Sequence, residues 1–275
     1  MASSEAPPSV LRDWLRRHHR VFALTGAGVS TASGIPDYRD EQGAWKRRPP
    51  VTIQALRAEP GIYRRYWARA YAGWPHVSTV SPSGAHRAFA AWEATGSLLH
   101  VVTQNVDGLH QRAGHRAVID LHGRLDTVVC LGCRARAPRD EVQAWMGAAN
   151  AGWQAESATA PDGDADIDTT AVARFEPPHC EACGGLLKPD VVFFGENVPP
   201  ARYAAARAAL DAADALLVAG SSLMVYSGYR FVLQAHEAGL PVVIVNRGRT
   251  RGDDLASLKV EGDVGTVLQD ALGAG

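Results

Sequence analysis

The chain has 275 residues, of which 46% are hydrophobic and 21% are charged, as in an ordinary globular protein. Its 28 basic and 29 acidic residues give a net charge of -1, so no overall positive charge draws the chain to nucleic acid or to an anionic membrane. We therefore expect partners to be recognised locally, with neither nucleic acid nor a membrane among them. The length is sufficient for one large domain that carries a smaller insert.

The N-terminal region bears on where the protein resides. Residues 1–9 contain no basic region followed by an apolar core, so we expect no signal peptide. Four arginines between residues 12 and 20 lie among apolar residues at helical spacing, which favours a solvated helix face over an organelle transit peptide. No apolar stretch approaches the roughly 20 residues that span a bilayer. We expect a cytoplasmic protein that acts as a monomer.

Five apolar runs have the length of buried parallel strands, and the segments between them are long enough for crossover helices. The runs are Val21–Thr25, Leu98–Thr103, Ala117–Leu121, Ala215–Ala219 and Pro241–Val245. An alanine-rich helix with proline at its start is predicted over Pro200–Ala213. Together these elements predict an α/β fold with a doubly wound, Rossmann-like parallel sheet.

The first run ends in a glycine pair, Gly26 and Gly28. Because they lack side chains, these residues let backbone N–H groups approach a pyrophosphate at a helix N-terminus, which predicts a dinucleotide site. The spacing departs from the G-x-G-x-x-G of dehydrogenases, since Thr31 stands at the third glycine position and Gly34 comes three residues later. A strand-to-helix turn without a ligand explains the glycines equally well, but the polar groups of residues 30–39 exceed what a turn requires.

A polar block, Gln104–His110, follows the second run at the same edge of the sheet. Asn105 and Asp107 supply an amide and a carboxylate that can orient a bound ligand, and Gln104 can form a hydrogen bond with a sugar. The alternative explanation is a polar turn that caps a helix beginning near Gly108. Asp107 can serve both purposes.

His122 follows the run Ala117–Leu121, at the carboxyl end of a strand, where ligands bind in such sheets. Gly123 leaves space beside it. A neutral imidazole at this place can act as a general base at physiological pH. On position alone, a hydrogen-bonded histidine of the core is the more common explanation.

Two insertions interrupt the sheet. Residues 36–83 contain aromatic side chains at helical spacing, which predict a small helical module that packs its own core. Residues 125–189 include a stretch, 155–170, with few large apolar side chains, which predicts a mobile surface loop. Its alternating aspartates resemble a calcium loop superficially, but the glycine and the terminal glutamate of that motif are absent.

The second insertion also holds all four cysteines, arranged as two C-x-x-C pairs. They are Cys130, Cys133, Cys180 and Cys183. Four thiolates match the tetrahedral coordination of one structural Zn²⁺ ion, whereas disulfides are disfavoured in a cytoplasmic protein. His179 stands beside one of these cysteines, but with four thiolates present we expect it to be a bystander.

The run Ala215–Ala219 ends in Gly220-Ser221-Ser222, which repeats the strand and glycine pattern of the first run. The two loops can therefore face one ligand across the carboxyl edge of the sheet.

The stretch Gly26–Arg39 resembles the sirtuin signature GAG-[IV]-S-x-x-SGIPD-[FY]-R. Further blocks resemble sirtuin motifs in the same order, namely Gln104–His110, Leu121–Gly123, Gly220–Leu223 and Val245–Gly248, together with the two C-x-x-C pairs. The resemblance extends from about residue 10 to the last helix. It implies a large, discontinuous NAD-binding domain over residues 1–35, 84–124 and 190–275, a helical insert over 36–83 and a zinc-binding insert over 125–189.

The sirtuin resemblance implies an NAD-dependent protein-lysine deacylase with NAD as co-substrate and one structural Zn²⁺ ion. In this chemistry the acyl-lysine carbonyl oxygen attacks the anomeric carbon of the nicotinamide ribose and nicotinamide leaves. His122 is expected to remove a proton from a ribose hydroxyl, which attacks the resulting imidate. Water then releases the lysine and an O-acyl-ADP-ribose. Asn105 and Asp107 are the other expected catalytic residues.

The resemblance also assigns the NAD site. The carboxamide pocket is assigned to Ile35, Asp37, Asn105 and Asp107. The phosphates are assigned to Gly26, Ala27, Ser30, Arg39 and Ser222, and the adenosine half to Gly220, Asn246 and Val264. Neighbouring residues of the same motifs complete the expected NAD site, namely Gly28, Tyr38, Gln104, Val106, Ser221, Arg247 and Gly248.

The acyl-lysine substrate is expected to bind along Lys188–Glu196, an extended, edge-like run. Pro189 blocks ordinary sheet pairing there, so a substrate peptide can add as a strand between this run and the loop after Ser222. The lysine tunnel is expected to use Val191, Val192, Phe193, Phe194 and Val225. Without the family resemblance, a plain buried strand explains the run.

Two regions, Arg65–Arg69 followed by Gly73–Pro75 and the later loop Gly220–Phe231, resemble class II sirtuins of the bacterial type. The Tyr-x-x-Arg pair by which class III sirtuins hold succinyl groups is unmatched when Trp67 and Ala70 are aligned with it, which disfavours desuccinylation. Three alternatives remain: a protein mono-ADP-ribosyltransferase on the same NAD site, a catalytically idle module that binds NAD and zinc, and a hydride-transferring dehydrogenase. The irregular glycine spacing counts against the dehydrogenase.

Overall fold

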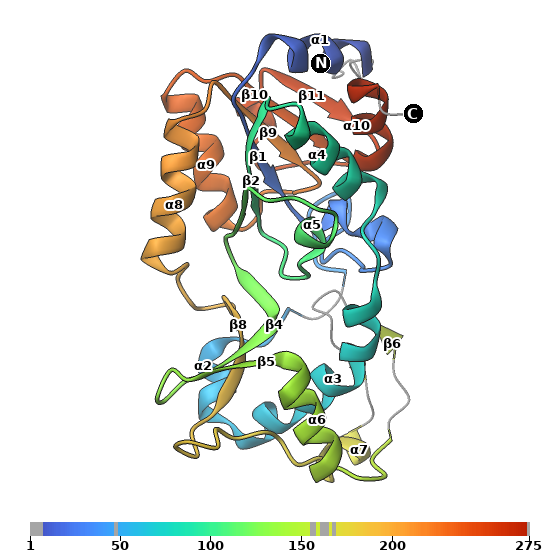
Figure 1. Ribbon diagram of the computed structural model, residues 1–275, viewed down its shortest axis with the longest axis vertical. Coiled ribbons are helices and arrows are strands. Elements are labelled where there is room, and N and C mark those ends of the chain that lie inside the picture. Colours follow the sequence, from blue (N-terminus) through green and yellow to red (C-terminus); the bar gives the residue numbers. More distant parts are fainter. Residues whose placement is uncertain (1–7, 47–48, 155–157, 160–164, 167–168, 274–275) are drawn as a thin grey trace.

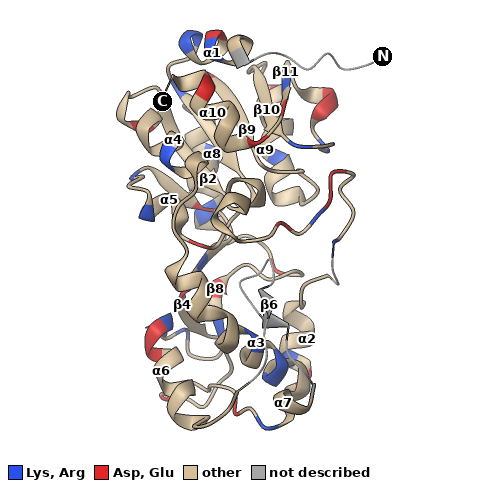
Figure 2. Ribbon diagram, turned by 90° about the vertical axis from the view of Figure 1, so that its right-hand side faces the viewer, with Lys and Arg blue, Asp and Glu red and all other residues tan. Residues whose placement is uncertain are grey.

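The computed structural model describes residues 8–46, 49–154, 158–159, 165–166 and 169–273. The molecule is elongated and has two parts, a larger one built on a parallel sheet and a smaller one that holds a second sheet (Figure 1). In the view of Figure 2, Lys, Arg, Asp and Glu are scattered over both parts rather than gathered in one place. No helix among the described residues is both long enough and apolar enough to cross a membrane.

The larger part contains six parallel strands in the order β11-β10-β9-β1-β2-β3. Their bounds are Val21–Thr25 for β1, Leu98–Thr103 for β2, Val118–Asp120 for β3, Ala215–Ala219 for β9, Val242–Asn246 for β10 and Leu258–Glu261 for β11. The chain moves outward from β1 to β3 and later resumes at β9 on the other side of β1. The strand order therefore reverses at β1, which confirms the doubly wound sheet.

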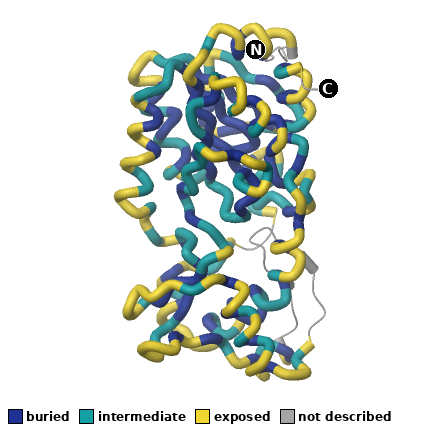
Figure 3. Tube along the Cα trace, viewed as in Figure 1, coloured by how far each residue is buried: buried dark blue, intermediate teal, exposed yellow. Residues whose placement is uncertain are grey.

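Helices cover both faces of this sheet. Val21 and Ala23 of β1 join the core beneath α1, α4 and α10, whereas Phe22 and Leu24 join the core beneath α8 and α9. Buried residues are concentrated in this sheet (Figure 3). The helix bounds are Pro8–Arg17 for α1, Gly84–Ala94 for α4, Pro200–Asp211 for α8, Tyr226–Glu237 for α9 and Val264–Leu272 for α10.

The smaller part contains three antiparallel strands in the order β5-β4-β8. These are Gly123–Cys130 for β4, Arg136–Pro138 for β5 and Leu187–Val191 for β8. The helices around them are Ile53–Ala58 (α2), Pro60–Thr79 (α3), Arg139–Ala149 (α6) and Thr169–Ala173 (α7). Two short strands, Ala158–Thr159 (β6) and Ala165–Asp166 (β7), pair with each other.

One core joins the two insertions. Trp67 of α3 and Met146 of α6 are both fully buried in it. Trp67 Nε1 donates to the backbone oxygen of Leu187 at 3.2 Å, and the Leu187 N–H donates to Tyr63 Oη at 2.9 Å. The expectation that residues 36–83 pack a core of their own is therefore wrong, because α3 packs against the cysteine-bearing insertion. The domain boundaries given above from the sirtuin resemblance stay a prediction.

The run that contains Pro189 differs from expectation. Pro189 belongs to β8 and lies opposite Val128 of β4, so the proline does not prevent sheet pairing. β8 is the edge strand of its sheet, a position where the missing N–H of proline is tolerated. Three aspartates of the acidic stretch, at positions 162, 164 and 168, lie outside the described residues, and so does most of the loop predicted there.

Three buried histidines lie behind the loop that follows β1. The rings of His86 and His110 are 4.7 Å apart between centroids, and those of His110 and His115 are 5.5 Å apart. His110 belongs to the short helix α5 (Leu109–Arg112), and its Nε2 lies 3.0 Å from Thr25 Oγ1 at the end of β1. Burial lowers the pKa of all three imidazoles, and that of His86 to about 3. They are therefore uncharged at neutral pH.

We predict that the free energy of unfolding falls as the pH is lowered from 6.5 towards 4. A histidine of the unfolded chain binds a proton near pH 6.5, whereas folded His86 does not until about pH 3, so acid favours the unfolded state. A buried neutral histidine of this kind contributes up to about 1.4 kcal/mol per pH unit in that window. Denaturant unfolding measured at several pH values between 7 and 4 checks the slope.

His86→Gln is the matched variant for this prediction. The His86 ring accepts a hydrogen bond from the Ser83 N–H at the start of α4, and glutamine can accept the same bond. The slope should become shallower by up to about 1.4 kcal/mol per pH unit. The exposed control His236→Gln should leave the slope unchanged. Identical slopes in the wild-type chain and in His86→Gln would contradict the prediction.

Candidate active site

A cavity of about 980 Å³ lies at the carboxyl ends of the parallel strands. The segments that follow β1, β2, β9 and β10 all line it, and so does the segment that follows β8 in the smaller part. This size is at the upper end of the range for ligand sites in proteins. The position is the one where ligands bind in doubly wound sheets, beside the strand at which the order reverses.

The two glycine loops meet at this edge of the sheet. The Gly28 N–H donates to the backbone oxygen of Gly220 at 2.8 Å. A Cβ atom on Gly28 would lie 2.8 Å from the Gly220 Cα, which is closer than Cβ atoms approach backbone in proteins. Only glycine therefore permits this backbone contact, and the loops after β1 and β9 face the same cavity, as the sequence predicts.

A polar cluster ties the loop after β1 to the loop after β2. Asn105 Nδ2 donates to Ser30 Oγ and to the Gly26 backbone oxygen, both at 3.0 Å. Ser30 Oγ donates to one carboxylate oxygen of Asp107 at 2.7 Å, and the Leu109 N–H donates to the other at 2.9 Å. Burial raises the pKa of Asp107. Asp107 thus accepts a hydrogen bond at the start of α5 with one carboxylate oxygen and holds the glycine loop with the other, so it can fill both roles.

His122 lies at the cavity wall directly before β4. Its Nδ1 is 2.9 Å from the backbone oxygen of Gln104, and its Nε2 is 2.8 Å from Ser227 Oγ. Burial lowers the pKa of His122 to about 4, and the charge of Arg202 lowers it further. The imidazole is therefore neutral at pH 7 and able to accept a proton.

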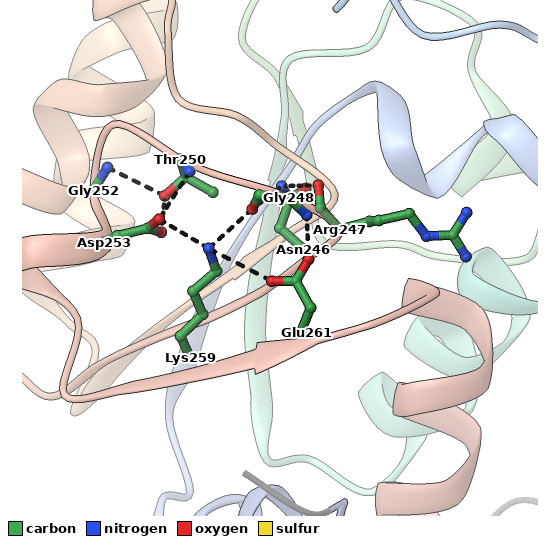
Figure 4. A network of polar contacts seen from close by, with 8 residues as sticks. All are labelled: Asn246, Arg247, Gly248, Thr250, Gly252, Asp253, Lys259 and Glu261. Carbon is green, nitrogen blue, oxygen red and sulfur yellow. Dashed lines mark hydrogen bonds and ion pairs between the residues drawn. The ribbon is translucent and has the colours of Figure 1, made fainter. Parts of the chain in front are cut away.

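The loop after β10 is held by charged residues that the sequence does not single out (Figure 4). Lys259 Nζ donates to the Gly248 backbone oxygen at 2.9 Å and pairs with Asp253 at 2.8 Å. Glu261 accepts a hydrogen bond from the Gly248 N–H. The Arg247 side chain extends away from this network (Figure 4) and lines the cavity. Gly248 lies outside the cavity lining and anchors the loop instead.

The residues expected to form the substrate tunnel all line the cavity. They are Val191, Val192, Phe193, Phe194 and Val225. Aromatic side chains that the sequence does not single out line it as well, namely Trp45, Tyr66, Tyr203 and Tyr226. The Arg39 guanidinium lies over the Trp45 ring, 3.8 Å from the ring centroid, in a cation–π contact. The Trp45 and Phe194 rings pack edge-on, with their centroids 5.6 Å apart.

The four cysteine sulfurs form a compact group in the smaller part. All four lie within 4.8 Å of one another, with Cys130 Sγ 3.5 Å from Cys183 Sγ and Cys133 Sγ 3.6 Å from Cys180 Sγ. A tetrahedral ion with Zn–S bonds of about 2.3 Å requires sulfurs about 3.8 Å apart, which these distances approach. A disulfide requires about 2.05 Å, so no sulfur pair is bonded. The thiolates fit one structural Zn²⁺ ion, and His179 is not in the group.

Comparison with known proteins decides the family. Residues 26–227 match the sequence model of the Sir2 family, which is well over half of the chain. The chain belongs to the Sir2 family. This confirms the resemblance to sirtuins.

Bacterial Sir2 relatives match along most of the chain. A protein of Xanthomonas axonopodis pathovar citri, named NAD-dependent protein deacetylase, is 60% identical over 91% of this chain and 86% of its own length. A protein of Bordetella bronchiseptica with the same name is 52% identical over 99% of this chain and 100% of its own length.

Solved Sir2 structures share the fold. A Sir2 structure with a p53 peptide and NAD⁺ has a TM-score of 0.77 at 29% identity and covers 98% of both chains. Another, with an inhibitor, 2'-O-acetyl-ADP-ribose and a deacetylated p53 peptide, has a TM-score of 0.73 at 30% identity, over 95% of this chain and 96% of its own.

The two residues aligned from the sequence with the succinyl-binding pair of class III sirtuins do not line the cavity. Trp67 is fully buried and Ala70 is 7% exposed, both in the core of the smaller part, so neither can contact an acyl group in the cavity. The residue of α3 that lines the cavity beside Phe193 is Tyr66, whose ring centroid is 5.3 Å from that of Phe193. The identities of Trp67 and Ala70 therefore do not exclude a succinyl group from the cavity.

We predict that the Sir2 chain binds one zinc ion and that removing it destabilises the smaller part. Cys133→Ser removes one of four ligands, so the chain should lose the ion, and the melting temperature should fall by at least about 5 °C. Inductively coupled plasma mass spectrometry gives the zinc content, and thermal unfolding gives the melting temperature.

His179→Gln is the matched control for zinc binding, because this side chain lies next to Cys180 but outside the sulfur group. It should retain one zinc ion per chain. Zinc loss in His179→Gln equal to that in Cys133→Ser would show that the four-thiolate assignment is wrong.

Proposed function

We propose that this chain is an NAD-dependent protein-lysine deacylase that converts NAD and an acyl-lysine into nicotinamide, lysine and an O-acyl-ADP-ribose. One observation carries the proposal: a neutral, partly buried His122 lines the same cavity as Asn105 and Asp107. The deacetylase names of relatives at 52–60% identity support the same activity. So do the Sir2 structures that contain a p53 peptide with NAD⁺ or with 2'-O-acetyl-ADP-ribose.

NAD, as a substrate, would occupy the part of the cavity on the larger sheet. The contact between Gly28 and Gly220 leaves two glycine loops facing the cavity, which suits a pyrophosphate. Asn246 and Val264 line the end assigned to adenosine. The remaining NAD contacts follow the residues assigned from the sequence, except that Gly248 acts through the position of its loop.

The nicotinamide ribose would lie near the polar cluster. Ile35 and Asp37 line the cavity with Asn105 and Asp107, which supports the proposal that these four residues form the carboxamide pocket. Asn105 and Asp107 are oriented by Ser30 rather than by solvent, so their positions are set before a substrate arrives. Such preorganisation lowers the entropic cost of reaching a reactive geometry.

The acyl-lysine would enter from the smaller part. After β8 ends, the chain continues along the cavity wall, where the Val192 N–H donates to the backbone oxygen of His122 at 2.8 Å. The methylene groups of lysine would pass along an apolar wall, which is formed by the side chains of residues 191–194 and of Val225. We assign acyl-lysine peptides or proteins as the partners. We place the enzyme in the class II branch because of the segments Arg65–Arg69, Gly73–Pro75 and Gly220–Phe231.

Incubation with NAD and a panel of acyl-lysine peptides tests the function directly. Mass spectrometry should show loss of one acyl group for each nicotinamide released, with the matching O-acyl-ADP-ribose. The panel, from acetyl through hydroxymethylglutaryl and succinyl to lipoyl, identifies the preferred acyl group. Intact acyl peptides together with ADP-ribosylated protein would instead establish the transferase alternative.

We predict that His122→Ala reduces kcat for deacylation by at least about a hundredfold, because general base catalysis contributes 10²–10⁴-fold. Binding of NAD, measured by calorimetry, should remain. His236→Ala, on the exposed face of α9, is the matched control and should keep full activity. Full turnover by His122→Ala would rule out the proposed role of this residue.

A further inference from the structure

We infer that Ser227 and His122 act together as one proton-accepting pair, in which Ser227 takes the proton from the ribose hydroxyl and passes its own proton to His122 Nε2. This inference rests on the proposed deacylase function and adds a residue to its machinery. In the relay, the O–H bond of the substrate hydroxyl breaks and a new O–H bond forms on Ser227 Oγ. The original Ser227 O–H bond breaks as an N–H bond forms on Nε2, and His122 becomes an imidazolium.

The hydrogen bonds of His122 dictate which ring nitrogen carries the proton. The Gln104 backbone oxygen can only accept, so the 2.9 Å contact requires a proton on Nδ1. A neutral imidazole then has its single lone pair on Nε2. Ser227 Oγ lies 2.8 Å from Nε2 and must donate to it. The one atom of His122 that can accept a proton is therefore already in contact with Ser227.

The fold brings Ser227 to this position through Gln104. Ser227 lies in the first turn of α9, next to Gly228. A Cβ atom on Gly228 would lie 2.4 Å from Gln104 Oε1, so glycine at this position lets the Gln104 carboxamide pack directly against the start of the helix. The Gln104 side chain is itself held by Ser221 Oγ at 2.8 Å. Gln104 thus holds His122 through its backbone oxygen, while its side chain packs against Gly228, the neighbour of Ser227.

The imidazolium of His122 depends on the Ser227 hydroxyl for stabilisation, because the ring has no charged hydrogen-bond partner among the described residues. In the part of the chain that the structure describes, the hydrogen-bond partners of the His122 ring are Gln104 and Ser227, both uncharged. The positive charge of Arg202, on α8, disfavours an imidazolium at His122. Arg202 forms an ion pair with Asp190 of β8 at 2.9 Å, and this pair partly compensates the repulsion. After proton transfer, the Ser227 hydroxyl can turn and accept from Nε2–H, whereas a methyl group could not.

Ser227 also has access to the substrate. It lines the cavity together with Val225 and Tyr226, at the start of α9. Its side chain is neither fully buried nor fully exposed, so a lone pair of Oγ can face a bound sugar while the O–H faces His122. This is the arrangement that a one-step relay between two neighbours requires.

Four proteins test the relay: the wild-type chain, Ser227→Ala, Ser227→Thr and the exposed control Ser78→Ala on α3. Each is assayed with NAD and the acyl-lysine peptide on which the wild-type chain is most active. Two rates are measured, the kcat for deacylation and the exchange of isotope-labelled nicotinamide into NAD. Because the base acts after nicotinamide leaves, exchange reports the first step alone.

We expect Ser227→Ala to lower kcat for deacylation by about 10- to 100-fold, a part of the general base contribution, with KM for NAD unchanged within about threefold. Nicotinamide exchange should persist, Ser227→Thr should recover most of the deacylation rate, and Ser78→Ala should match the wild-type chain. The relay is overturned by an unchanged or higher kcat in Ser227→Ala, which would mean that the substrate hydroxyl reaches His122 directly.

Equal loss of exchange and deacylation, or no recovery in Ser227→Thr, would also overturn the relay, since either result indicates a structural role. A wild-type chain that removes no acyl group from any peptide would refute the proposed function itself, and the relay would fall with it. That failure is visible before any variant is compared, so the two can be told apart.

Discussion

The backbone contact between Gly28 and Gly220 is the constraint on which the site depends. It brings the segments after β1 and β9 together at 2.8 Å, at the strand where the sheet order reverses. Any side chain at Gly28 would separate these segments. The polar cluster of Ser30, Asn105 and Asp107 is built on the same loop, so its geometry follows from this contact.

The smaller part supplies the opposite wall of the cavity. Its core draws on both insertions, and β4 begins at the residue after His122 while β8 runs back beside it. The sulfur group joins the start and the end of the second insertion, because Cys130 ends β4 and Cys183 lies shortly before β8. Zinc therefore has no direct contact with the chemistry but holds the strands that flank it.

Much of the fold and site could be predicted from the sequence because the informative signals are local. Apolar runs mark the central strands, and glycines or polar residues mark the strand ends that become the cavity. β11 escaped prediction because only Val260 in it is buried. The packing of α3 could not be predicted either, because aromatic residues occur on several of its faces. Only the contacts of α3 with β8 and α6 place Trp67 in the core and Tyr66 at the cavity. Ser227 carries no local signal at all, because its contact with His122 spans 105 residues.

The edge position of β8 has a consequence for how the protein behaves in a crowded solution. The edge strand of a sheet can pair with the edge of another chain, which is a common route to aggregation. Pro189 removes one hydrogen-bond donor from β8, and the strand ends at Val191, so the edge is short and interrupted. The backbone N–H and oxygen of Leu187 are also bonded to Tyr63 and Trp67 of α3, so β8 offers too few free backbone groups for extended pairing between copies.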